Sequence, residues 1–174
     1  MLDINEMTVL LTDDMPNMIN SLRRMMKILG YGKYFFTAGN GEEALKILKK
    51  EPVDLAFLDY NMPMMTGVEV LKEIREDRVL RDMPVIMITA QAYQEFVAEA
   101  GESDTDAYIL KPVTVKVLEE KVNMVVENAN NPSPMVFHLK LARDYEEDGN
   151  IDNAIEMARL AMEANPKASR PIRE

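Results

Sequence analysis

Five residues with reactive or metal-binding side chains each stand at the end of a short apolar run: Asp13, Asp14, Asp59, Thr89 and Lys111. Carboxylates that lie close together repel one another, and a hard divalent cation such as Mg²⁺ relieves that repulsion. A lysine ammonium can pair with a phosphoryl oxygen, and a threonine hydroxyl can hydrogen-bond to one. Once metal and lysine neutralise the incoming group, an aspartate can attack phosphorus and form an aspartyl phosphate. These residue types predict metal-dependent phosphoryl chemistry if the fold brings them together.

Predicted strands and helices alternate along residues 1–127, and these elements would have to bring the five polar residues together. Leu55–Leu58 and Val85–Ile88 are apolar at every position, which is typical of parallel strands that helices cover on both faces. Five strands alternating with five helices predict a doubly wound α/β domain with a parallel sheet. The predicted strands are 7–11, 34–38, 55–58, 85–88 and 107–110, and the predicted helices are 16–29, 41–50, 68–76, 94–100 and 115–127.

The predicted sheet places all five polar residues at one edge. In an open parallel sheet, ligands bind at the carboxyl ends of the strands. Taken singly, an aspartate at a strand end more often caps a helix or forms a turn, and a lone lysine is usually a solvated surface charge. Because all five residues end elements of a single sheet, their combination favours a metal and phosphate site over these ordinary roles.

Residues 55–63, with the sequence LAFLDYNMP, are followed by Thr66-Gly67 and resemble the phosphoacceptor segment of receiver domains in two-component response regulators. The resemblance covers residues 5–127 and extends to Asp13-Asp14, Asn40–Leu45, Thr89-Ala90 and Lys111-Pro112. It implies a flavodoxin-like sheet with strand order 2-1-3-4-5. It also implies that a sensor histidine kinase or phosphotransfer protein donates the phosphoryl group, and that the response is a change in protein–protein contact.

The resemblance assigns roles at the predicted site. Asp59 would accept the phosphoryl group. Asp14, Asp59 and the backbone carbonyl of Asn61 would bind Mg²⁺ directly, with Mn²⁺ as a substitute, and Asp13 would act mainly through water. Lys111 would bridge to the phosphoryl group, next to a cis Lys111-Pro112 peptide bond.

The resemblance also assigns a switch. Thr89, which Ala90 follows in the matched motif, would move toward the phosphoryl group, and Tyr108 would turn inward as it does so. The side chains of Asn61 and Gln91 would tune the lifetime of the phosphate. Two features depart from the family pattern: residues 104–107 (DTDA) stand where Gly-Ala is common, and Val113 replaces a common phenylalanine.

Residues 128–134 contain two prolines and predict a linker. Beyond it, residues 135–174 predict a helical hairpin and tail, with helices at 136–148 and 151–164 divided by Gly149-Asn150. The spacing of small residues, an aromatic and a proline is similar to a single tetratricopeptide repeat. A single repeat cannot bury its apolar face alone. We therefore expect the hairpin to pack on the receiver, on another copy in a homodimer, or on a partner protein.

The composition excludes several classes of protein. A formal charge of −10, from 20 basic and 30 acidic residues, disfavours nucleic acid as a partner. With no cysteine and one histidine, disulfides, thiolate metal sites and histidine metal sites are excluded. No apolar stretch approaches the roughly 20 residues that span a membrane, and residues 1–6 lack the pattern of a signal peptide. A cytoplasmic protein is expected.

Two other functions fit the same residues. A Mg²⁺-dependent phosphohydrolase could use Asp59 as its nucleophile, although residues 59–61 (DYN) lack the second acid that such enzymes usually place two positions later. An adaptor could keep the receiver fold without responding to phosphate. The intact set of five residues favours a phosphoacceptor with at most slow self-dephosphorylation over an enzyme or an inert adaptor.

Overall fold

A computed structural model describes residues 1–90 and 105–164 of the chain. The chain divides into two compact units, Met1–Ala129 and Asn130–Glu174. The predicted helix at 94–100 and the predicted site residue Gln91 lie outside the described residues.

The first unit is built on a five-stranded sheet in which every neighbouring pair is parallel. The strand order is β2-β1-β3-β4-β5, so the predicted flavodoxin-like topology is confirmed. The central strands β3 and β4 are buried at every position, as their continuous apolar sequences indicated. The strands are β1 (Thr8–Thr12), β2 (Tyr34–Ala38), β3 (Leu55–Asp59), β4 (Val85–Thr89) and β5 (Ala107–Leu110).

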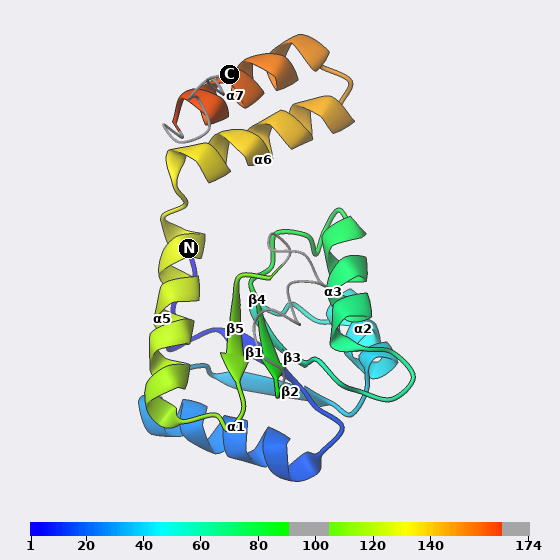
Figure 1. Cartoon of the computed structure of the whole chain (residues 1–174), viewed down its shortest axis with the longest axis vertical. Coiled ribbons are helices and arrows are strands. Elements are labelled where there is room, and N and C mark those ends of the chain that lie inside the picture. Colours follow the sequence, from blue (N-terminus) through cyan, green and yellow to red (C-terminus); the bar gives the residue numbers. More distant parts are fainter. Residues whose placement is uncertain (91–104, 165–174) are drawn as a thin grey trace, which may run out of the picture. The chain divides into compact units, whose positions relative to one another are not determined.

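Helices cover both faces of this sheet. Helices α1 and α5 lie on one side, and α2 and α3 lie on the other (Figure 1). Each side has its own buried apolar cluster, one around Phe57 and Leu22 and the other around Leu58 and Leu71. Alternate residues of β3 therefore face opposite cores. The helices are α1 (Pro16–Leu29), α2 (Gly41–Lys50), α3 (Gly67–Glu76) and α5 (Val115–Asn130).

Capping residues and a glycine mark the ends of these helices. The Asn40 side chain accepts a hydrogen bond from the Glu43 backbone N–H at 2.9 Å and caps α2. Thr66 and Glu69 form a reciprocal capping box at the start of α3. Helix α1 ends at Gly30, whose φ of 73° is left-handed and suits a residue without a Cβ. The caps of α2 and α3 fix the ends of the loops that follow β2 and β3, and Gly30 turns the chain from α1 toward β2.

Helix α5 is longer than the sequence predicted. It continues to Asn130, so residues 128–130 of the predicted linker are helical. The two prolines do not prevent this, because a proline restricts the residue before it and not the preceding turn. The non-helical connection is only 131–133, and Pro134 occupies the first turn of the next helix, where its missing N–H costs nothing.

The second unit contains a helical hairpin, α6 (Pro134–Glu147) and α7 (Ile151–Glu163). Ser133 caps α6, Gly149 turns the chain with a φ of 78°, and Asn150 caps α7. An apolar stripe along α7 is only partly covered, and its residues are Ile151, Ala154, Ile155, Ala158, Ala161 and Met162. Ala161 is buried, but Ile151, Ile155 and Met162 are more than half exposed. The hairpin buries Ala161, covers Ala154 and Ala158 in part, and leaves the large residues of this stripe at the surface.

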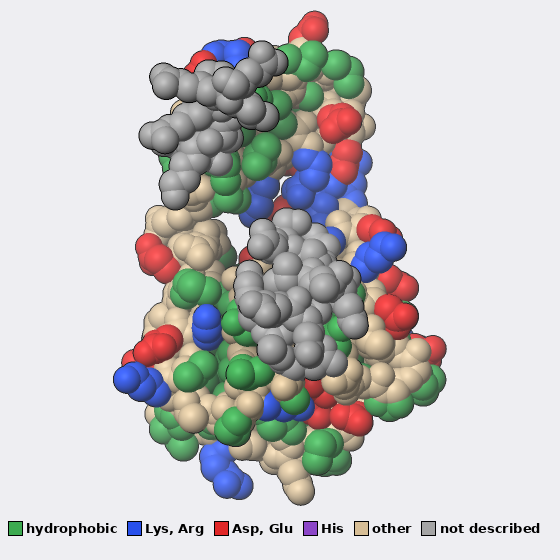
Figure 2. Space-filling model, in the orientation of Figure 1, with side chains coloured by type: hydrophobic (Ala, Val, Ile, Leu, Met, Phe, Trp, Pro, Cys, Tyr) green, Lys and Arg blue, Asp and Glu red, His purple; other side chains and the backbone are tan. Residues whose placement is uncertain are grey.

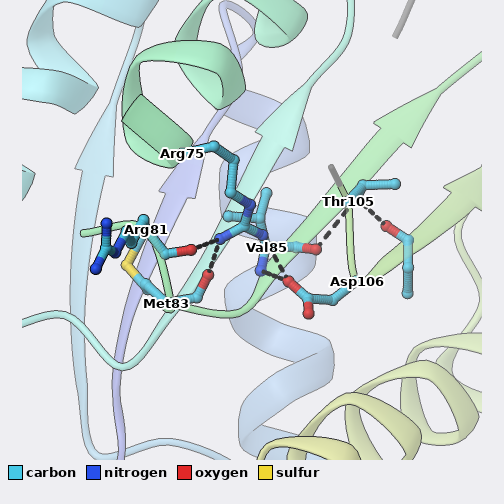
Figure 3. A network of polar contacts seen from close by, with 7 residues as sticks. Arg75, Arg81, Met83, Val85, Thr105 and Asp106 are labelled. Carbon is cyan, nitrogen blue, oxygen red and sulfur yellow. Dashed lines mark hydrogen bonds and ion pairs between the residues drawn. The ribbon is translucent and has the colours of Figure 1, made fainter. Parts of the chain in front are cut away.

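A polar network ties the amino ends of β4 and β5 to α3 (Figure 3). The Arg75 guanidinium donates to the carbonyls of Arg81 and Met83, each at 2.7 Å, and to the Asp106 carboxylate at 2.8 Å. The same carboxylate accepts the Val85 backbone N–H at 2.8 Å. No local sequence signal indicated this network, since it joins residues up to 31 positions apart.

Substitution of Arg75 by methionine is expected to destabilise the first unit by about 2 kcal/mol. The aliphatic stem stays, but two backbone carbonyls and the Asp106 carboxylate lose their donor. Urea unfolding followed by circular dichroism measures the loss. Lys72→Met, at an exposed position of the same helix, is the control and should change stability by a few tenths of a kcal/mol. Equal effects of the two substitutions would remove the stabilising role of the network.

Candidate functional site

The carboxyl edge of the sheet brings the predicted acids together. Asp13 and Asp14 directly follow β1, and Asp59 is the last residue of the neighbouring strand β3. Their carboxylates each offer an oxygen that lies within 4.8 Å of the other two. Asp13 and Asp59 are buried, whereas Asp14 is exposed, so the cluster is open to solvent on one side.

Lys111 reaches this cluster from the other half of the sheet. Its backbone N–H donates to the Thr89 carbonyl at 2.7 Å, which extends the pairing of β4 and β5 by one residue. Its Nζ lies 3.2 Å from Asp59 Oδ1 and 3.4 Å from Asp13 Oδ2. The Lys111-Pro112 bond is cis, as the resemblance implied.

Burial is the main reason why Asp13 and Asp59 have raised pKa values. Burial, followed by the charge of Asp13, raises the pKa of Asp59 to about 6, although Lys111 opposes the shift. Burial also raises the pKa of Asp13, against the lowering effect of the Met15 backbone N–H and Lys111. Burial lowers the pKa of Lys111, but the charges of Asp59 and Asp13 outweigh burial and raise it overall. The pocket therefore holds more negative charge than its single lysine compensates.

The donor set fits a hard divalent cation. All the clustered donors are carboxylate oxygens, the ligands that Mg²⁺ and Mn²⁺ prefer. Burial raises the pKa of Asp59 most and the charge of Asp13 adds to the shift, and a bound cation would relieve this second, repulsive part. The residues present therefore suit Mg²⁺ at Asp13, Asp14 and Asp59.

The other predicted site residues surround this pocket. Thr89 is buried at the end of β4, and Ala90 after it is exposed. Asn61 is exposed in the loop two residues beyond Asp59. Tyr108 is half-buried on β5, and Lys121 Nζ lies 5.6 Å from the centre of its ring. The roles implied for these residues stay predictions.

Gly67 is a site residue whose role the sequence reasoning missed. It begins α3, and a Cβ at this position would clash with the backbone carbonyl oxygen of Asp59 at the end of β3. Its backbone N–H donates to the Tyr60 carbonyl at 3.0 Å. The Thr66-Gly67 pair quoted for the family resemblance was the available signal, but only the folded backbone shows that it serves close packing.

Gly67→Ala is expected to lower the free energy of unfolding by about 2 kcal/mol or more, because the added methyl must displace the backbone of Asp59. Gly39→Ala is the matched control, since a Cβ there meets only a flexible Glu43 oxygen at 3.7 Å. Chemical unfolding of both variants gives the comparison. A Gly67 variant as stable as the Gly39 variant would contradict the steric argument.

The fold and the pocket together define a class of protein. A parallel sheet with order 2-1-3-4-5, an acidic cluster after its first and third strands and a lysine after its fifth are the features of a receiver. The family model of the response regulator receiver domain matches residues 9–123. The chain belongs to this family, and the predicted family is confirmed.

Named relatives agree with this assignment. The chain is 38% identical over 121 residues to the chemotaxis protein CheY-3 of Vibrio cholerae, a match that covers 70% of this chain and 92% of the relative. It is 34% identical over 124 residues to the chemotaxis protein CheY of Pseudomonas aeruginosa, covering 71% of this chain and 99% of that protein.

Solved structures show the same fold. A CheY-like receiver domain from Methanospirillum hungatei superimposes with a TM-score of 0.62 at 29% identity, covering 72% of this chain and 97% of that one. The chemotaxis response regulator CheY4 of Vibrio cholerae gives a TM-score of 0.63 at 28% identity, covering 69% and 98%. Helices α6 and α7 lie outside the residues that the family model matches.

Among residues 1–90 and 105–164, no helix is long and apolar enough to cross a membrane.

Proposed function

We propose that this protein accepts a phosphoryl group on Asp59 from a histidine kinase or phosphotransfer protein, in a Mg²⁺-dependent reaction, and signals through protein contact. The observation that carries the proposal is the Asp59 carboxylate, held 3.2 Å from the Lys111 ammonium within a cluster of three acids. Family membership supports the class of reaction.

In the proposed step, an Asp59 carboxylate oxygen attacks the phosphorus of a phosphohistidine. The bond between phosphorus and the imidazole nitrogen breaks, and the imidazole leaves with the bonding electron pair. Lys111 can turn its ammonium from Asp59 Oδ1 toward a phosphoryl oxygen, since the two positions are adjacent. Bound Mg²⁺ would be held by Asp14, Asp59 and the Asn61 carbonyl, with Asp13 through water, and would neutralise charge on the incoming group.

The response is proposed to involve Thr89 and Tyr108. Thr89 ends β4 beside Lys111, and Tyr108 lies two strand positions before Leu110 on the adjacent β5. A hydrogen bond from the Thr89 hydroxyl to the phosphoryl group would pull the end of β4 inward. Tyr108 could then change its packing against β4, and Gln91 and Asn61 would tune how long the phosphate lasts.

Phosphorylation from a small donor tests the proposal. Incubation with acetyl phosphate and Mg²⁺ should add one phosphoryl group to the intact mass of the wild-type chain. Asp59→Asn should gain none, and EDTA should prevent the gain in the wild type. No adduct, together with no response to beryllofluoride, would overturn the proposal and leave the phosphate-insensitive adaptor.

Measurement of catalytic turnover distinguishes the phosphohydrolase hypothesis from the receiver hypothesis. A phosphoacceptor releases its own phosphate slowly after a single labelling event, whereas an enzyme would convert many equivalents of a phosphate ester. Phosphate release in large excess over protein, lost in Asp59→Asn, would favour the enzyme.

The hairpin of α6 and α7 is proposed to be the contact element, because several of its large apolar side chains are exposed. Its resemblance to a single tetratricopeptide repeat supports a role in binding protein, since such repeats bury their faces against neighbours.

A further inference from the structure

Helix α1 carries an isolated basic face. The helix contains three basic residues and no acidic one, in a chain whose net charge is −10. Its outward side chains line a shallow hollow: Asn20, Arg23, Arg24, Lys27 and Ile28. In the described part of the chain, none of the three cations forms an ion pair. Ile28, at the end of this face, is 67% exposed.

Helix α7 carries a face of exposed apolar side chains bordered by acidic ones. Ile151, Ile155 and Met162 lie within about 40° of one another around the helix axis and are 52%, 62% and 60% exposed. An acid directly follows each of them: Asp152, Glu156 and Glu163. The acids therefore form an edge beside the apolar stripe. Figure 2 shows exposed apolar side chains on the unit that contains this helix.

The charge of the whole hairpin unit agrees with that of this face. This unit, residues 130–174, contains eight acidic and six basic residues, so its net charge is −2. Asp152 has no ion pair among the described residues, whereas Glu156 and Glu163 share Arg159. The unit is therefore acidic, and its large apolar side chains need a partner that also tolerates acid.

We propose that the basic face of α1 binds the acidic, apolar face of α7 in a second copy of this chain. Arg and Lys side chains suit this role because their aliphatic stems cover apolar surface while their charged ends reach acids at its edge. Arg23 and Lys27 are about 6 Å apart along α1, which matches the about 6 Å between Asp152 and Glu156 along α7.

In the proposed dimer each copy gives its basic face to the acidic face of the other, so the two contacts are equivalent and related by a twofold axis. A contact of this size, made of solvent-exposed charges around a narrow apolar stripe, is expected to be weak, with a Kd on the order of 10 µM. It should weaken at least about tenfold when the salt concentration rises from about 0.05 M to 0.5 M.

Charge reversal on either face provides the test, with sedimentation velocity as the readout. Arg24→Glu/Lys27→Glu reverses the α1 face, and Asp152→Lys/Glu156→Lys reverses the α7 face. Each double variant alone places like charges together and should be monomeric at concentrations where the wild type is dimeric. A one-to-one mixture of the two variants restores both contacts in a mixed pair and should dimerise.

A matched control separates this contact from a general charge effect. Lys46→Glu/Lys49→Glu on α2 has the same spacing, the same net change and the same place in its last turn, and it should remain dimeric. A monomeric wild type, persistence of the dimer in both variants, or a mixture that stays monomeric would each overturn the proposal.

The inference deepens the proposed contact role of the hairpin. Labelling by acetyl phosphate should be the same in these variants as in the wild type. Absence of labelling in the wild type would count against the phosphoacceptor and not against the dimer.

Discussion

Lys111→Met is expected to slow phosphorylation by acetyl phosphate by about 100-fold or more. The methionine keeps a similar aliphatic length but removes the only cation that an ion pair places on Asp59 in the described residues. Removal of one preorganised donor to developing charge commonly costs a factor of 10² to 10³ in rate. The rate of mass gain at saturating Mg²⁺ measures the effect.

A metal titration distinguishes this loss from a damaged pocket. Lys111 competes with a bound cation for the carboxylates of Asp59 and Asp13, so its removal should leave Mg²⁺ affinity unchanged or tighter. Lys116→Met, at an exposed position on α5, is the control and should label like the wild type. Labelling of Lys111→Met at the wild-type rate would exclude a direct role for the ammonium. Loss of Mg²⁺ affinity together with labelling would indicate a disrupted site instead.

Asp59→Asn is expected to stabilise the metal-free protein, and the gain should depend on pH. The pKa of Asp59 is raised to about 6 in the folded state by burial and by the Asp13 charge. The folded state therefore binds the proton more tightly than the unfolded chain, whose aspartates titrate near pH 4. Asp59 contributes stability below the unfolded pKa, and this contribution is lost as pH rises through about 6. Asparagine avoids the loss because it does not ionise.

Urea unfolding in the presence of EDTA measures the change in the free energy of unfolding. Relative to the wild type, Asp59→Asn should be more stable by about 1–3 kcal/mol at pH 7.5, and this gain should shrink by about 1–2 kcal/mol at pH 4.5. Glu73→Gln, at an exposed position on α3, is the control and should change stability by a few tenths of a kcal/mol. Added Mg²⁺ should stabilise the wild type but not Asp59→Asn. A gain for Asp59→Asn that does not change with pH would contradict the raised pKa.

The acids of the pocket and the basic face of α1 lie on neighbouring parts of the chain but do not overlap. Asp13 and Asp14 precede the first turn of α1, whereas Arg24 and Lys27 lie in its second half. Charge reversal at the outward positions leaves Ile19, Leu22 and Met26, which anchor the helix in the core, in place. Phosphoryl chemistry and self-association can therefore be tested independently in this chain.

The first unit was predictable because its signals are local. A strand such as 85–88 is apolar at every position, and Asn40 stands where a cap must accept an N–H, so short-range chemistry identified these elements. The order of the polar residues along the chain, together with the rule that parallel strands end at one edge, predicted the pocket. The predicted end of α5 was wrong by three residues, because Pro132 restricts only the residue directly before it and does not stop the preceding turn.

The sequence by itself determined which residue types can do chemistry and which elements carry them. Only the tertiary structure decided how those residues interact, because distances and burial depend on segments far apart in the chain. The 3.2 Å contact of Lys111 with Asp59 joins β5 to β3, and the raised pKa of Asp59 needs both burial and Asp13. The same holds for Gly67, whose close approach to Asp59 exists only in the folded backbone. It holds equally for α7, whose large apolar side chains are left exposed because a single neighbouring helix covers only one side of it.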